Sequence, residues 1–174
     1  GLGMDGTGPV CVEGKGVLPA DGIYETFDTY DLTFTYANGV KMVTVHPEQG
    51  VRFIGNDGWV HVWRGGIIAE PEDLLHEVIE LDDQRLYIDS AQQQDWRVWA
   101  SPGHHQDWLN CIRTRRPPIC NEEIGHRSIT VCHLANICMR LGRKVQWDPE
   151  KEEFVNDKEA NTFLSRPYRA PWRL

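Results

Sequence analysis

Alternation of hydrophobic and polar residues dominates the first part of the chain and predicts β-strands over residues 9–69. The clearest unit is residues 31–45, where two alternating runs flank Asn38-Gly39. This dipeptide favours a two-residue hairpin loop, because both loop residues need a positive φ. Further alternating runs at 51–55 and 59–63 predict a second hairpin, and Gly65-Gly66 turns the chain into another strand.

The length of the first hairpin loop sets the expected register. A two-residue loop places Phe34 opposite Val43 and Leu32 opposite Val45, so these four side chains are expected in the core. The other face then carries Thr33, Thr35, Met42 and Thr44. That face is half polar, so it is expected to be either solvated or an interface.

Helical spacing replaces alternation in the second part of the chain. His105, Trp108, Leu109 and Ile112 recur one turn apart and predict a helix that Pro117-Pro118 ends. A longer helix is predicted over residues 122–141, with Gly142 just past its end. Its expected apolar face is Ile124, Val131, Leu134, Ala135, Cys138 and Leu141, and its polar stripe is Glu122, His126, Thr130, His133, Asn136 and Arg140.

Shorter segments complete the expected organisation. Residues 71–76 and 156–164 favour short helices, residues 85–89 and 144–147 favour strands, and residues 166–174 favour an extended tail. Strands followed by helices predict an α+β fold, an open and mainly antiparallel sheet with helices packed on one face. The expected division is a loop or linker at 1–8, a single domain at 9–164 and a tail at 165–174.

The length and the net charge of the chain exclude several classes of protein. A chain of 174 residues is too short for a nucleotide-binding domain plus a substrate domain. There is no long apolar run and no signal-peptide pattern, so a membrane location is not expected. The net charge is −8, with −11 in residues 1–100, which disfavours nucleic acid. Five cysteines without a C-x-x-C pair favour buried thiols and a cytoplasmic location, with export left open.

Two short motifs are weak candidates for ligand binding. Residues 1–6 match G-x-G-x-x-G, but Thr7-Gly8-Pro9 follows where a dinucleotide site needs a helix, so a loop is expected. His104-His105 with Asp107 resembles a metal cluster, yet neighbouring helical side chains point about 100° apart. No metal is expected there. The two histidines are instead candidates for contacting a substrate or a neighbouring domain, with plain surface or core roles as the alternative.

Two further side-chain rows carry candidate chemistry. The helical stripe with His126, His133 and Arg140 contains poor helix formers, which favours contact with a partner domain or a sugar hydroxyl over simple solvation. The row Trp59, His61 and Trp63 could stack on a sugar, but aromatic rings on an open sheet more often pack against a helix or another subunit.

Five strings resemble one known family. They are residues 2–9 (LGMDGTGP), 53–60 (FIGNDGWV), 103–112 (GHHQDWLNCI), 123–133 (EIGHRSITVCH) and 169–172 (RAPW). Together they resemble the C-terminal domain of Gfo/Idh/MocA-type oxidoreductases, most closely the bacterial subgroup labelled NADH-dependent dehydrogenase. The resemblance spans nearly the whole chain.

The resemblance implies two domains, one that binds the cofactor and one that binds the substrate. An N-terminal Rossmann domain would bind NAD(P) and supply a Glu-Lys-Pro lysine, and an Asp-x-x-x-His helix would precede residue 2. The chain contains no Rossmann fingerprint and no Glu-Lys-Pro, and no Asp-x-x-x-His stands before residue 2, so no cofactor is expected in this chain, which looks truncated and is expected to be inactive alone. The implied function is binding of a sugar or polyol substrate and oligomerisation through an open sheet face.

That implied function assigns two groups of candidate residues. Substrate or domain contacts are expected at His104, His105, His126, His133 and Arg140, and subunit contacts at Thr33, Thr35, Met42, Trp59 and Trp63. The implied partners are the missing Rossmann domain, a second copy and a sugar-like substrate. The alternative is a carbohydrate-binding or assembly module without catalysis.

Overall fold

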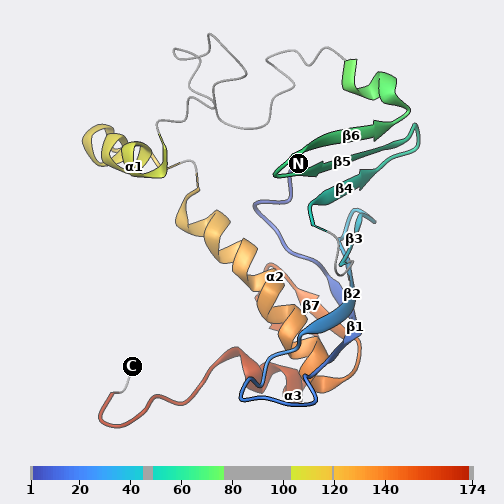
Figure 1. Ribbon diagram of the computed structural model, residues 1–174. Coiled ribbons are helices and arrows are strands. Elements are labelled where there is room, and N and C mark those ends of the chain that lie inside the picture. Colours follow the sequence, from blue (N-terminus) through green and yellow to red (C-terminus); the bar gives the residue numbers. More distant parts are fainter. Residues whose placement is uncertain (1, 45–48, 77–102, 119, 173–174) are drawn as a thin grey trace. The chain divides into compact units, whose positions relative to one another are not determined.

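The computed structural model describes residues 2–44, 49–76, 103–118 and 120–172, without the side chains of residues 103 and 104 (Figure 1). These residues form two compact units. The first comprises Gly1–Gly3 and Pro47–Asn121, and the second comprises Met4–His46 and Glu122–Leu174. The domain boundaries expected from the sequence stay a prediction.

A five-stranded antiparallel sheet forms the second unit. Its strand order is β3-β2-β1-β7-β8. The bounds are β1 Cys11–Val17, β2 Thr29–Thr35, β3 Lys41–Val43, β7 Val145–Asp148 and β8 Glu153–Phe154. The helices of this unit are α2 Glu122–Leu141, α3 Lys158–Asn161 and the 3-10 turn η4 Thr162–Leu164. The expected bounds of the long helix are confirmed.

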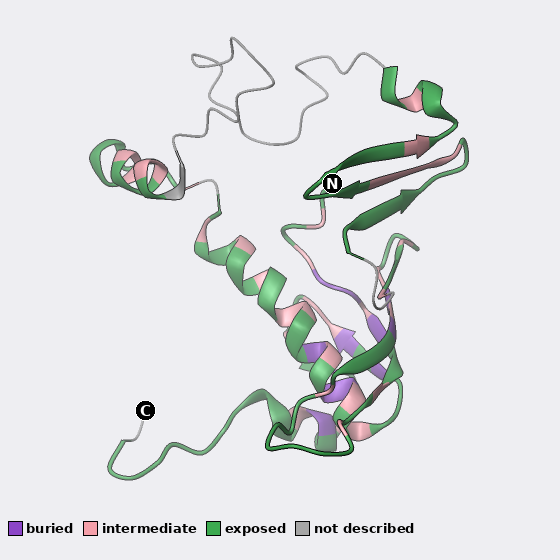
Figure 2. Ribbon diagram, in the orientation of Figure 1, coloured by how far each residue is buried: buried purple, intermediate pink, exposed green. Residues whose placement is uncertain are grey.

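The core lies between this sheet and the two helices. Buried side chains come from β1, β2, β7, β8, α2 and α3, as the purple segments of Figure 2 show. They are Val12, Leu32, Phe34, Leu134, Ile137, Cys138, Val145, Trp147, Phe154 and Ala160. Helix α2 packs on β1, and the Cys138 thiol donates to the Val12 carbonyl over 3.6 Å. The α+β class with helices on one sheet face is therefore confirmed in this unit.

The first hairpin has a different register from the expected one. The Tyr36 amide donates to the Val40 carbonyl over 2.9 Å, which closes a three-residue loop with Gly39 at a φ of 86°. Phe34 therefore lies opposite Met42, and Thr33 lies opposite Val43. The shift by one residue moves Val43 out of the core face and Met42 onto it.

The burial of side chains on β2 and β3 agrees only in part with the expected faces. Leu32 and Phe34 are buried, as expected, whereas Val43 is exposed, so the core assignment of Val43 is wrong. Val45 lies outside the described residues. Thr33 and Thr35 stay together on the face away from α2, but Met42 does not share it, because its partner Phe34 is a core residue.

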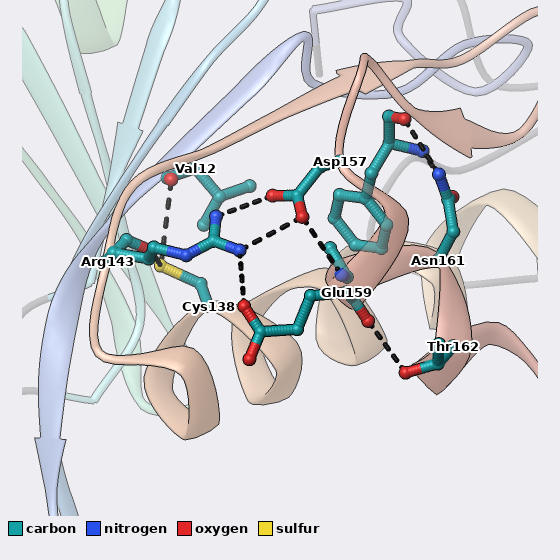
Figure 3. Close-up of polar contacts among 9 residues, drawn as sticks. Val12, Cys138, Arg143, Asp157, Glu159, Asn161 and Thr162 are labelled. Atoms are coloured by element: carbon teal, nitrogen blue, oxygen red, sulfur yellow. Dashed lines mark hydrogen bonds and ion pairs between the residues drawn. The ribbon is translucent and has the colours of Figure 1, made fainter.

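A clamp of ion pairs ties the end of α2 to α3 (Figure 3). Gly142 ends α2 with a φ of 63°, and its amide donates to the Cys138 carbonyl over 3.0 Å. Arg143 then pairs with both carboxylate oxygens of Asp157 and with Glu159. Asp157 also caps α3, accepting from the Ala160 amide over 3.0 Å. These contacts lower the pKa of Asp157 to about 2.

A three-stranded antiparallel sheet lies in the first unit. Its order is β4-β5-β6, with bounds Val51–Ile54, Trp59–Trp63 and Gly66–Glu70. The expected second hairpin is confirmed. A 3-10 turn, η1 Glu72–His76, follows where a short helix was expected, and helix α1 spans Gly103–Thr114. The strand expected at 85–89 lies outside the described residues.

Candidate functional site

The polar stripe of α2 is largely occupied by contacts within its own unit. His126 Nε2 lies 2.6 Å from Glu152 Oε1, and Arg127 Nη1 lies 3.1 Å from the same oxygen. Arg127 also donates to the Pro149 carbonyl over 2.6 Å. The turn between β7 and β8 is thus held against the start of α2. This contact gives His126 a structural role.

The other stripe residues lie too far apart to act on one reacting atom. His126, His133 and Arg140 are seven residues apart, which is about 10 Å of helix for each step. Arg140 donates to Asn136 Oδ1 over 2.6 Å, one turn away on the same helix. His133 is exposed and has no partner among the described residues. The stripe therefore offers separate contact points along one helix face.

The two histidines of α1 are only partly described. The expected helix and its spacing are confirmed, and His105 is exposed on it. The side chain of His104 lies outside the described part. Burial raises the pKa of the Cys111 thiol, and the carboxylate of Asp107, which accepts from this thiol over 3.8 Å one turn earlier in the helix, raises it further. In the described residues, no group of three or more His, Cys, Asp or Glu could hold a metal ion.

The face of the three-stranded sheet that carries Trp59, His61 and Trp63 contains a depression of about 340 Å³. Gln49, Arg52, His61, Trp63 and Ile68 line it. Pairing across the sheet explains this grouping, because His61 lies opposite Arg52 on β4 and opposite Ile68 on β6. Side chains directly opposite one another in neighbouring strands lie on the same face. We call this site the aromatic depression.

The aromatic depression combines flat rings with polar groups. The rings of His61 and Trp63 have centroids 5.3 Å apart at an angle of 41°. The Arg52 guanidinium carbon lies 4.8 Å from the centroid of the Trp59 ring, a cation–π distance. Nδ1 of His61 is buried and has no hydrogen-bond partner among the described residues.

Such a surface suits a ligand with one apolar face and several hydroxyl groups. The exposed part of the Trp63 ring can stack on the C–H face of a sugar, while Gln49 and Arg52 can donate to hydroxyl oxygens. Sequence reasoning identified the tryptophans and His61 but missed Arg52, Gln49 and Ile68. The alternation of β4 together with the short turn at 56–57 could have placed Arg52 beside His61.

The five residues expected at subunit contacts do not lie on one sheet. Thr33, Thr35 and Met42 belong to the five-stranded sheet, whereas Trp59 and Trp63 belong to the three-stranded one. The assignment of these five residues to subunit contacts therefore stays a prediction.

The first residues do not fit a dinucleotide. After Gly6, the chain passes through Gly8 and Pro9, both buried, into strand β1. No helix begins there, so no row of free helical amides can receive a pyrophosphate. The residues present therefore do not form an NAD(P) site at this segment.

Comparison with known proteins gives one informative result. The family model for the oxidoreductase family, C-terminal alpha/beta domain, of the Gfo/Idh/MocA type, matches residues 2–174. Searches of curated proteins and of solved structures found no match. Among the described residues, no helix is both long enough and apolar enough to cross a bilayer.

Proposed function

The chain belongs to the Gfo/Idh/MocA oxidoreductase family, as a C-terminal alpha/beta domain. On this basis we propose that it is the substrate-binding domain of an NAD(P)-dependent dehydrogenase of the NADH-dependent subgroup. In that role it binds a sugar or polyol whose hydroxyl-bearing carbon is oxidised or whose carbonyl is reduced. In this proposal a separate nucleotide-binding domain supplies the cofactor, and the described residues 2–9 support it, because they lead into β1 without a helix that could hold a pyrophosphate.

The aromatic depression is the observation that supports a sugar or polyol as the ligand. Carbohydrates are bound by stacking on an aromatic ring combined with hydrogen bonds to hydroxyl groups. The depression offers Trp63 for the first interaction, and Arg52 and Gln49 for the second. A volume of about 340 Å³ lies at the lower end of the usual range for small-molecule sites.

Subunit contacts are proposed at the face of the five-stranded sheet that lies away from α2. This face carries Thr33, Thr35 and the exposed Val43. A sheet face that mixes apolar and hydroxyl side chains can be covered by the same face of a second copy. The proposal therefore keeps Thr33 and Thr35 and replaces Met42 with Val43. It does not include Trp59 and Trp63, which belong to the three-stranded sheet.

Replacing Trp63 with alanine tests the ligand class. The Trp63→Ala variant should bind monosaccharides or polyols about twofold to tenfold more weakly than the parent chain, because ring stacking contributes about 0.5–1.5 kcal/mol. Titration calorimetry or ligand-observed NMR measures the difference. Trp108→Ala, at an exposed tryptophan of α1, is the matched control and should leave the affinity unchanged. Equal affinities for the parent chain and the Trp63 variant would contradict the proposal.

The second candidate function is a carbohydrate-binding or assembly module without catalysis, which the same depression favours. The reading frame upstream of the codon for residue 1 separates the two functions. A nucleotide-binding domain encoded in frame supports the dehydrogenase, and a start codon at that point supports the binding module.

A further inference from the structure

The connection between β1 and β2 is acidic and carries exposed apolar side chains. Residues 18–28 contain Asp21, Glu25 and Asp28 and no lysine or arginine. At its centre Ile23 is 91% exposed and Tyr24 is 74% exposed. We call this segment the acidic loop.

The base of the acidic loop is held by the body of its unit. The Asp28 amide donates to the Val17 carbonyl over 3.1 Å, which closes the loop. The side chains of Phe27 and Met139 lie so close over Gly16 that a Cβ at this position would overlap both. The loop therefore presents Ile23 and Tyr24 outward from a fixed base.

The segment after η4 has the opposite charge. Residues 165–172 contain Arg166 and Arg169 and no acidic residue, with prolines at 167 and 171. Tyr168 is 62% exposed and Trp172 is 68% exposed. The segment runs away from the sheet of its unit and is exposed along its length (Figures 1 and 2). We call it the basic tail.

The charged side chains of both segments form no ion pair with the described part of their own chain. Among the described residues, no ion pair involves Asp21, Glu25 or Asp28, and none involves Arg166 or Arg169. The exposure of the tail aromatics and of Ile23 and Tyr24 means that the tail does not cover the loop of its own chain. Complementary charges and exposed aromatics on both segments are the features of a contact between copies.

We infer that the basic tail of one copy docks on the acidic loop of a second copy, in a reciprocal exchange. A two-fold axis makes the contact twice, since each copy carries one tail and one loop. Burial of two aromatic rings from each tail contributes about 600–1,000 Å², because one such ring buries about 150–250 Å². With a similar area from the loops, the total reaches the roughly 1,200–2,000 Å² of a stable interface.

Charge reversal on both segments tests this contact. Arg166→Glu with Arg169→Glu should weaken self-association about tenfold, since like charges then face each other across the contact. Asp21→Lys with Glu25→Lys should weaken it similarly. The four changes together should restore it. Arg64→Glu with Arg113→Glu is the matched control, because it changes the net charge as much as the tail variant does, at exposed residues outside both segments and outside the five-stranded sheet. Sedimentation equilibrium measures association, and circular dichroism confirms the fold of each variant.

Each outcome decides the inference. The inference is supported if self-association is lost in both double variants and recovered in the quadruple variant. Weaker self-association of the parent chain in high salt also supports it. A monomeric parent chain overturns it, and so does equal association of all variants, which would leave the sheet face as the site of subunit contact. A cross-link between Tyr168 and Tyr24 within one chain also overturns it. None of these outcomes bears on sugar binding at the aromatic depression.

Discussion

At the scale of single residues, Asp157 joins two functions in one carboxylate. It accepts from the Ala160 amide as the cap of α3, and it receives the Arg143 guanidinium that follows α2. The guanidinium contributes most to lowering its pKa, and the amide of Ala160 adds to the effect. The same pair raises the pKa of Arg143, so the arginine stays charged under all ordinary conditions.

The pH dependence of stability should reflect this carboxylate. Its pKa is about 2 in the folded chain and 3.8 in its ordinary state, so the unfolded chain binds the proton more tightly. The stabilisation is therefore present above about pH 4 and is lost as the pH falls towards 2. Asp157→Asn, which keeps a capping oxygen, should lower stability at neutral pH and flatten this acid-side slope. Chemical denaturation at several pH values measures both effects.

Glu159 provides the control for that prediction. It pairs with the same arginine at 3.0 Å but is largely exposed and caps nothing. Glu159→Gln should therefore change the acid-side slope less than Asp157→Asn does. An unchanged slope in the Asp157 variant would show that the ion pair does not contribute to stability.

At the scale of elements, α2 organises the second unit. Its buried face carries Leu134, Ile137 and Cys138, and its first turns are tied to the β7–β8 turn through His126 and Arg127. Gly142 ends the helix, and Arg143 directly after it reaches α3. One helix thus contacts the sheet, a turn and the next helix.

Truncation of a side chain on the buried face of α2 should be costly. Leu134→Ala removes a fully buried leucine and should destabilise the chain by about 2–5 kcal/mol, since it leaves a cavity in a packed core. Ile129→Ala, on the exposed face of the same helix, should change stability by about 0.5 kcal/mol or less. Thermal or urea unfolding compares the two. Similar losses would mean that the face assignment of α2 is wrong.

For the whole molecule, the question is whether the described residues could hold a nicotinamide cofactor beside a substrate. Hydride transfer requires that a nicotinamide and the substrate carbon be held together. The described residues 2–9 lead into β1 without a helix, so this segment offers no row of helical amides to a pyrophosphate. The family match spans residues 2–174 and is to a C-terminal domain.

Activity should therefore require a second domain. The purified 174-residue chain should give no NAD(H)- or NADP(H)-dependent turnover with sugars or polyols, because the proposed function assigns the cofactor to a separate nucleotide-binding domain. The absorbance of the reduced nicotinamide measures this. The same chain joined in frame to its nucleotide-binding domain should turn over. Robust turnover by the chain alone would contradict the proposed function.

The sequence by itself determined the features that depend on neighbouring residues. The bounds of α2 followed from helical spacing and from Gly142, and the second hairpin followed from alternation around 56–58. The order of strands before helices gave the α+β class. Five short strings indicated the family. Each of these signals lies within one segment, because helix periodicity, caps and short turns are local properties of the chain.

Strand register and the contacts between distant segments became apparent only in the folded chain. A three-residue loop in place of the expected two-residue one moved Met42 opposite Phe34, because register depends on loop geometry that Asn38-Gly39 does not fix alone. The aromatic depression arose from pairing Arg52 and Ile68 with His61. The contact of His126 with Glu152 joins residues 26 positions apart. These groupings come from packing between distant segments, for which local periodicity carries no signal.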